Sequence, residues 1–149
     1  MSIKKTIQTA LIGICLFSFS QSAFADYDGG GDSPTYAKPF NRGEFASGYI
    51  DDRYDVDWFK WTNDTGITQT VNVYLSTPYW ENYDIIAVYK LRDGSYLTSQ
   101  DIDRGSKGNL DHYKFYYISP GYTIYWKIVP HTRNDFSTTN KYFTWFTLS

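Results

Sequence analysis

Short segments rich in β-branched and aromatic side chains alternate with polar turn clusters along most of the chain. In the clearest alternation, Val71, Val73 and Leu75 would face one side of a strand. Residues 85–89 are apolar on both faces, which indicates a centrally placed strand. The predicted strands cover residues 44–50, 56–62, 67–76, 83–91, 95–100, 110–118, 122–129 and 140–148. This pattern predicts an all-β fold, a single jelly-roll-like β-sandwich of about eight antiparallel strands.

Residues 1–25 have the layout of a secretory signal peptide. Lys4 and Lys5 precede an apolar run over residues 7–19, and Ala23-Phe24-Ala25 places small residues where a signal peptidase reads. The run is shorter than the roughly 20 apolar residues that span a bilayer, although a retained anchor is the alternative interpretation. We therefore expect cleavage after Ala25, no stable membrane anchor, and a secreted, extracellular protein.

Cleavage would change both the cysteine content and the charge of the chain. The 124 remaining residues would contain no cysteine, because Cys15 leaves with the signal. Loss of Lys4 and Lys5 leaves 12 basic and 16 acidic side chains, a net charge of −4. This balance argues against a nucleic-acid partner, which calls for a basic patch. Stability must then come from apolar burial or from a bound metal.

The expected mature chain divides into two parts. Residues 26–40 form an acidic, glycine-rich arm in which no apolar periodicity is visible at the start. Residues 41–149 carry the strand and turn pattern and are expected to form the β-sandwich domain. Because no peptidase sequence precedes this domain, we expect it to act as a stand-alone module.

Five segments resemble a known family in their order along the chain. They are D-S-P-T-Y-A-K-P-F at 32–40, G-Y-I at 48–50, D-V-D-W-F at 55–59, Y-D-I-I-A-V-Y at 83–89 and P-G-Y-T-I-Y-W-K-I at 120–128. This order resembles the bacterial pre-peptidase C-terminal domain family, which includes the collagen-binding domains of clostridial collagenases. The resemblance covers essentially the whole mature chain. It implies a secreted, non-catalytic β-sandwich.

The same resemblance implies a calcium site between the arm and the start of a strand. Asp32, Asp55 and Asp57 are the first candidate ligands, and Asp28 and Asp52 are further candidates. Calcium takes several oxygen ligands, and residues at positions 55 and 57 of one strand would share a face. The chain departs from the family in having glycines where a carboxylate usually precedes the arm's aspartate. The alternative is that these carboxylates are solvated turn residues.

The 15 Tyr, 10 Phe and 5 Trp residues are more than a small sandwich can bury. Tyr113, Phe115 and Tyr117 alternate and are expected on one strand face. Exposed aromatic rings suit docking against sugar rings or extended peptides. In the collagen-binding relatives tyrosines on one sheet face hold the ligand, so the resemblance points to Tyr113, Tyr117, Tyr122 and Tyr125 as ligand-binding residues. Core or surface filling is the alternative role for each of them.

Catalysis has little support in the sequence. His112 and His131 are the two histidines, and neither a G-x-S-x-G nor an H-E-x-x-H motif occurs. We therefore predict a non-enzyme: a secreted binding module, stabilised by calcium, that presents an aromatic face to an extracellular polymer such as matrix protein, cell wall or polysaccharide. The alternatives are a secreted effector or inhibitor, a chaperone-like partner of another exported protein, and, less favoured, a small hydrolase.

Overall fold

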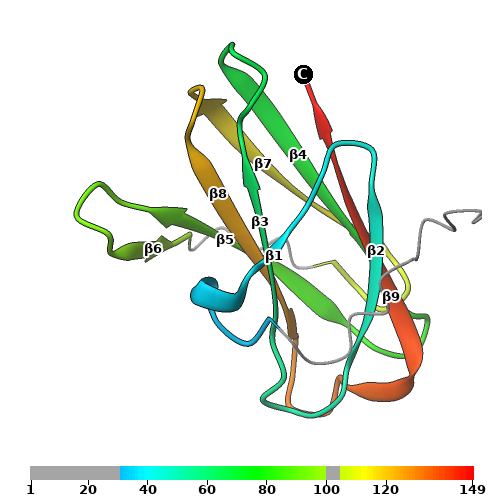
Figure 1. The fold of residues 1–149 in the computed structure, drawn as a ribbon. Helices are drawn as coiled ribbons and strands as arrows, with labels where there is room; N and C mark the ends of the chain where they lie inside the picture. The colour runs from blue at the N-terminus through cyan, green and yellow to red at the C-terminus, as the bar shows by residue number, and fades with distance from the viewer. Residues whose placement is uncertain (1–30, 100–104) are drawn as a thin grey trace, which may run out of the picture.

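The computed structural model describes residues 31–99 and 105–149. Within these ranges the chain forms two β-sheets packed face to face, with one short 3-10 helix, η1 (Pro34–Tyr36) (Figure 1). The predicted all-β sandwich is therefore confirmed. The expected signal peptide and Asp28 lie outside the described residues. In the described part of the chain, no helix has the length and apolar character needed to cross a membrane.

The nine strands of the described residues divide five to four between the sheets. The larger sheet contains β1 (Lys38–Pro39), β3 (Asp57–Thr62), β8 (Thr123–Pro130), β5 (Tyr83–Lys90) and β6 (Tyr96–Thr98), in that spatial order. The smaller sheet contains β2 (Phe45–Ile50), β9 (Ser137–Leu148), β4 (Gln69–Ser76) and β7 (Leu110–Ile118), in that order. All pairs are antiparallel except β1 with β3.

All eight predicted strands are present, with bounds that differ from the predicted ones by a few residues. The additional strand, β1, is too short for a sequence pattern to reveal. It pairs Lys38 with Phe59 and Pro39 with Lys60 at the edge of the larger sheet. Proline lacks a backbone N–H, so an edge is the position that it tolerates. The second half of the predicted arm is thereby attached to the sandwich.

The core lies between the two sheets and follows the predicted alternation. Val71, Val73 and Leu75 on β4 are completely buried. On the facing sheet, the rings of Phe59 and Trp126 stack with centroids 5.7 Å apart. Aromatic side chains bury large areas and favour such offset contacts. Burial of these rings supplies apolar stabilisation that a chain of this size needs.

One face assignment on β7 is wrong because the strand contains a bulge. Phe115 pairs with Val71 and Ile118 pairs with Gln69, so two β7 residues stand opposite the single residue between them on β4. The extra residue interrupts the alternation. Phe115 is completely buried, whereas Tyr117 is 81% exposed and has φ of 57°. Tyr117 therefore does not share the face of Phe115, as the alternation predicted.

At one end of the sandwich, Asn63 fastens two turns together. Its amide nitrogen donates to the carbonyl oxygens of Ile67 at 2.7 Å and Ile118 at 2.8 Å. Its amide oxygen accepts from the hydroxyl of Thr65 at 2.7 Å. Asn63 is 1% exposed, and its bond to the Ile118 carbonyl is buried. The residue joins the β3–β4 turn to the end of β7.

At the opposite end, Asp135 joins three loops. Its carboxylate accepts from the backbone of Asn82 at 3.2 Å and of Thr132 at 3.0 Å. It also forms an ion pair with Lys107 at 3.2 Å. Asp135 is 3% exposed. Burial by itself raises the pKa of its carboxyl, but hydrogen bonds from the Thr132 hydroxyl, Lys107 and the Asn82 backbone lower the pKa overall. Asn63 and Asp135 thus tie the loops at the two ends by polar contacts.

Candidate functional site

The arm lies along β3, which brings Asp32 to the start of that strand. The backbone N–H of Trp58 donates to the carbonyl of Gly31 at 2.9 Å, and that of Phe40 donates to Lys60 at 2.9 Å. A Cβ atom on Gly31 would lie 3.0 Å from the backbone nitrogen and oxygen of Trp58. Glycine is the residue that permits this close approach.

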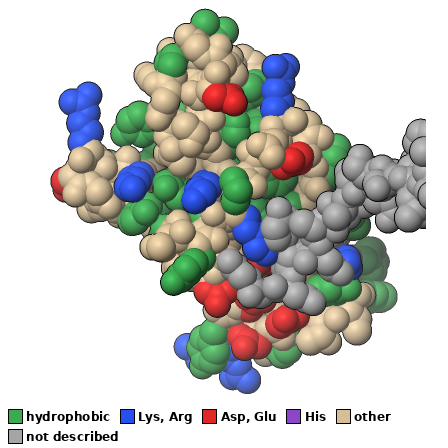
Figure 2. Space-filling model, viewed as in Figure 1, with side chains coloured by type: hydrophobic (Ala, Val, Ile, Leu, Met, Phe, Trp, Pro, Cys, Tyr) green, Lys and Arg blue, Asp and Glu red, His purple; other side chains and the backbone are tan. Residues whose placement is uncertain are grey.

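Acidic side chains gather beside this contact. A hollow of about 300 Å3 is lined by residues from the arm and from the β2–β3 loop, namely Asp32, Asp51, Asp52, Tyr54, Asp55 and Val56. Figure 2 shows Asp and Glu side chains collected at the lower end of the molecule, where that loop lies in Figure 1. The structure therefore brings together three of the predicted metal ligands, Asp32, Asp52 and Asp55.

The donor chemistry of this hollow suits a hard cation such as calcium, which prefers carboxylate oxygens. Two of the carboxylates are already engaged: Asp55 accepts from the backbone of Asp51 at 2.7 Å, and Asp52 from that of Tyr54 at 2.6 Å. Among residues 31–99 and 105–149, no group of three or more His, Cys, Asp or Glu side chains is arranged to hold a metal ion. The ligand types fit calcium, whereas their present positions do not converge.

Asp57 occupies a different environment from Asp55. It is 2% exposed, is absent from the lining of the hollow, and accepts a hydrogen bond from the Tyr142 hydroxyl at 2.5 Å. Burial, with a smaller contribution from the nearby charges of Asp55 and Asp32, raises the pKa of Asp57 to about 7, although the hydrogen bond from Tyr142 lowers it. Gly48 makes room for the pair, since a Cβ there would lie 2.7 Å from the Tyr142 hydroxyl.

The four predicted ligand-binding tyrosines lie in different parts of the sandwich. Tyr113 is half-buried against Phe115 with ring centroids 5.0 Å apart, and its hydroxyl donates to Ser99. Tyr125 is 7% exposed in a small cluster on the outer side of the larger sheet. Tyr117 is exposed at the β7 edge, and Tyr122 lies in the β7–β8 turn. They do not form one aromatic face.

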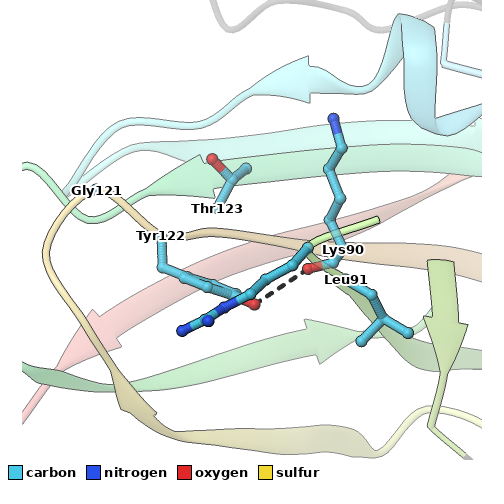
Figure 3. Close-up of a pocket in the computed structure, with 6 residues that line it drawn as sticks. Lys90, Leu91, Gly121, Tyr122 and Thr123 are labelled. Atoms are coloured by element: carbon cyan, nitrogen blue, oxygen red, sulfur yellow. Dashed lines mark hydrogen bonds between the residues drawn. The ribbon is translucent and has the colours of Figure 1, made fainter. Parts of the chain in front are cut away.

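Tyr122 borders a small open pocket, shown in Figure 3. The pocket has a volume of about 210 Å3 and is lined by Lys90, Leu91, Arg92, Gly121, Tyr122 and Thr123. The Tyr122 hydroxyl donates to the backbone carbonyl of Lys90 at 3.2 Å, which ties the turn to the end of β5. The ring of Tyr122 therefore has a structural contact in addition to its exposed surface.

The outer face of the smaller sheet carries a continuous row of rings that sequence reasoning missed. Phe45, Trp145, Tyr74 and His112 stand in register on β2, β9, β4 and β7. Successive ring centroids lie 5.6, 5.3 and 4.8 Å apart, and the last two pairs are stacked. Strands lie about 4.8 Å apart, so in-register rings must meet across them. The row crosses the whole width of the sheet.

Further apolar side chains extend this row into a patch. In the neighbouring register Phe143 on β9 is 48% exposed and Leu110 on β7 is 54% exposed, while Phe45 is 57% exposed. Contiguous exposed apolar surface of this kind marks interaction sites. We call the outward positions of these four strands, centred on the row of rings, the aromatic sheet face.

A histidine and a carboxylate meet elsewhere in the structure. Nδ1 of His131 lies 3.0 Å from Oδ1 of Asp84, and Asp84 is 6% exposed. Such a pair can orient an imidazole, but nucleophilic catalysis also needs a hydroxyl or thiol in reach of the ring. Among the described residues, no hydrogen bond joins His131 to a serine, threonine or cysteine side chain.

Two β-sheets packed face to face, with an N-terminal arm laid along β3, define a β-sandwich module. The sequence matches no family model and no curated protein. The fold is similar to that of the pre-peptidase C-terminal domain of a collagenase from Bacillus anthracis, with a TM-score of 0.54 and 12% identity. That match covers 74% of this chain and 94% of the other. The resemblance predicted from the sequence is thus confirmed at the level of the fold.

A mitogen derived from Yersinia pseudotuberculosis also matches, with a TM-score of 0.46 and 20% identity over 70% of this chain and 83% of the other. This match is too distant to support any argument. At such identities likeness fixes the architecture, and function has to be argued from the side chains of this chain.

Proposed function

We propose that this chain is a secreted, non-catalytic binding module whose aromatic sheet face holds an extracellular polymer. The observation that carries the proposal is the row of Phe45, Trp145, Tyr74 and His112 across all four strands. A rigid sheet presents these rings without the ordering cost that a mobile loop would incur on binding. The similar fold of a collagenase's non-peptidase domain agrees with a binding role.

Co-sedimentation with insoluble collagen, bacterial cell wall and chitin tests the proposal. We expect the chain to sediment with at least one of them and Trp145→Ala to lose most of that binding. Tyr117→Ala is the matched control, because Tyr117 is 81% exposed at the β7 edge and stands outside the row. Equal losses in both variants would contradict this placement, and failure to sediment with any polymer would contradict the proposal.

We further propose that calcium binds between Asp32 and Asp55 and fastens the arm to the β2–β3 loop. The charges of Asp51 and Asp32 contribute, after burial, to raising the pKa of Asp55, so these carboxylates repel one another. A divalent cation would remove that repulsion and stabilise the folded state in proportion to its occupancy.

Thermal melting in calcium and in chelator tests the calcium proposal. We expect millimolar calcium to raise Tm in the wild type and to leave Tm of Asp32→Asn unchanged. Asp64→Asn removes an exposed carboxylate on the β3–β4 turn and should keep the full calcium response. An unchanged wild-type Tm at millimolar calcium would refute the site.

A braced loop favours a second function, that of a partner for another exported protein. Tyr79 and Trp80 are 71% and 70% exposed at the tip of the β4–β5 loop, with ring centroids 4.6 Å apart. Lys107 donates to the Trp80 carbonyl at 2.7 Å, and Gly108 to Pro78 at 3.1 Å. Rigidly held exposed aromatics are typical anchors of protein interfaces. Capture from culture medium that is lost in Trp80→Ala and kept in Trp145→Ala would support this function.

A further inference from the structure

Two hollows adjoin at one end of the larger sheet. The first is the pocket beside Tyr122 described above, which we call the Tyr122 pocket. The second, which we call the Lys60 hollow, has a volume of about 330 Å3 and is lined by Pro39, Phe40, Asn41, Arg42, Lys60, Trp61, Thr62 and Asp64. Thr62 of the Lys60 hollow pairs with Thr123 of the Tyr122 pocket, and their hydroxyls are hydrogen-bonded at 2.7 Å. The two hollows therefore meet at a ridge of two hydroxyl groups.

Each hollow contains two cationic side chains. Lys90 and Arg92 line the Tyr122 pocket, and Arg42 and Lys60 line the Lys60 hollow. Within the described part of the chain, no ion pair joins any of these four to an Asp or Glu. Nζ of Lys90 lies 5.9 Å from the centroid of the Tyr96 ring, a contact that restrains the side chain and leaves its charge in place. All four charges are therefore available to a ligand.

Few carboxylates oppose these cations. Of the residues that line the two hollows, Asp64 alone is acidic, which leaves the linings with a net charge of +3. Asp93 follows Arg92, but its carboxylate accepts hydrogen bonds from the backbone and the hydroxyl of Ser95 at 2.9 and 2.6 Å. Figure 2 shows Asp and Glu side chains gathered mainly at the lower end of the molecule, and Lys and Arg side chains over its middle and upper parts. Positive charge is thus concentrated on a chain whose net charge is −2.

The sheet holds the two sets of cations apart and on one face. Lys60 lies on β3 and Lys90 on β5, and both strands flank β8, so the strands that carry them are about 10 Å apart. Lys60 shares a face of β3 with Thr62, which pairs with Thr123. In Figure 3 the side chains of Thr123 and Lys90 point to the same side of the sheet. A ligand that reaches both lysines must therefore pass over the hydroxyl ridge.

We propose that this end of the larger sheet binds an acidic glycan, with one anionic group in each hollow and neutral sugar over the ridge between them. The site is separate from the aromatic sheet face, so the inference stands or falls independently of the proposed function. Volumes of about 210 and 330 Å3 lie near or below the lower limit for drug-sized ligands, so each hollow suits one charged sugar unit. The threonine hydroxyls of the ridge both donate and accept, which matches the hydroxyls of a sugar.

The same features disfavour two other polyanions. Single-stranded nucleic acid binds through bases that stack on aromatic rings, whereas threonines form the ridge between the two hollows. An anionic membrane presents its charges in a plane, and a plane cannot enter two hollows that a ridge separates. A chain that carries its charges at intervals, with polar uncharged groups between them, fits the arrangement better.

Binding of carboxymethyl dextran and of dextran tests the inference, because the two polymers share one backbone and differ in charge. We expect the mature chain to bind carboxymethyl dextran at low salt, to bind it more weakly as salt is added, and not to bind dextran. Lys60→Ala and Lys90→Ala should each weaken binding about tenfold, since each removes one charged contact. Arg133→Ala is the matched control, because it removes an exposed cation from the β8–β9 loop at the opposite end of β8.

Four outcomes would overturn the inference. Equal binding of dextran would show that the anionic groups are not recognised. Equal losses in Arg133→Ala and the two lysine variants would show that the polymer responds to net charge and not to the hollows. Binding of poly-glutamate as tight as that of carboxymethyl dextran would assign the site to acidic peptides, and binding of phosphatidylglycerol vesicles without carboxymethyl dextran would assign it to a membrane.

Discussion

Asp57 makes stability depend on pH in the direction opposite to that of an ordinary paired carboxylate. Burial raises its pKa from 3.8 to about 7 in the folded chain. Between these values the folded state keeps a proton that the unfolded state has lost. The contribution of Asp57 to the free energy of unfolding is therefore fully present below about pH 4, and it is lost as pH rises to about 7.

The test is to compare wild type with Asp57→Asn in chelator across this pH range. The free energy of unfolding of the wild type should fall by up to about 1.4 kcal/mol per pH unit because of this group. The Asn side chain in Asp57→Asn cannot ionise but can still accept a hydrogen bond from Tyr142, so the variant should not show this fall. Urea unfolding at several pH values measures it. Parallel pH profiles for the two proteins would show that Asp57 stays ionised in the fold.

At the scale of elements, the strands could be predicted because turns and apolar alternation are local signals. The β7 bulge could not be predicted, because the sequence alternation of Tyr113 and Phe115 continues without a visible break to Tyr117. The sequence did not predict β1, because its two residues are too few to show an alternation of apolar and polar side chains and form a strand only by pairing with β3. Pairing between distant strands decides both features.

The same limit explains what could be predicted of the site. Asp32 and the β2–β3 loop were placed together through the family resemblance, and the arm's contact with β3 agrees with that placement. The row of rings joins residues 45, 74, 112 and 145, which meet through the register of three strand pairs. A signal was available in Tyr74 and Trp145, which occupy outward strand positions where a solvated sheet would carry polar residues.

Tyr117 supplies a prediction about the bulge. A non-glycine residue at φ of 57° is strained, and its 81% exposed ring contributes little burial. Tyr117→Gly should therefore keep or raise the free energy of unfolding, by up to about 1 kcal/mol. The neighbouring Tyr116→Gly, at a residue without positive φ, should lower it by about 0.5–1 kcal/mol. Equal destabilisation by both substitutions in denaturant titrations would contradict the bulge geometry.

For the whole molecule, Asn63 and Asp135 perform a role that disulfides perform in many exported domains, since each joins loops that are remote in sequence. Asn63→Ala should lower the free energy of unfolding by about 1–3 kcal/mol, because it leaves the buried carbonyl of Ile118 without this donor. Asp135→Ala should cost a similar amount, and Asp135→Asn less, because an amide oxygen can still accept from the backbone of Asn82.

The two residues lie at opposite ends of the sandwich, since Asn63 follows the end of β3 that pairs with the start of β8, and Asp135 lies beyond the end of β8. Their separation of several strand residues predicts additive losses in the double variant, within about 0.5 kcal/mol. If urea unfolding of the double variant gives the wild-type m-value, the sandwich unfolds as one cooperative unit that both residues stabilise. A double loss much smaller than the sum, with a reduced m-value, would instead show that one end already unfolds separately when its polar contacts are removed.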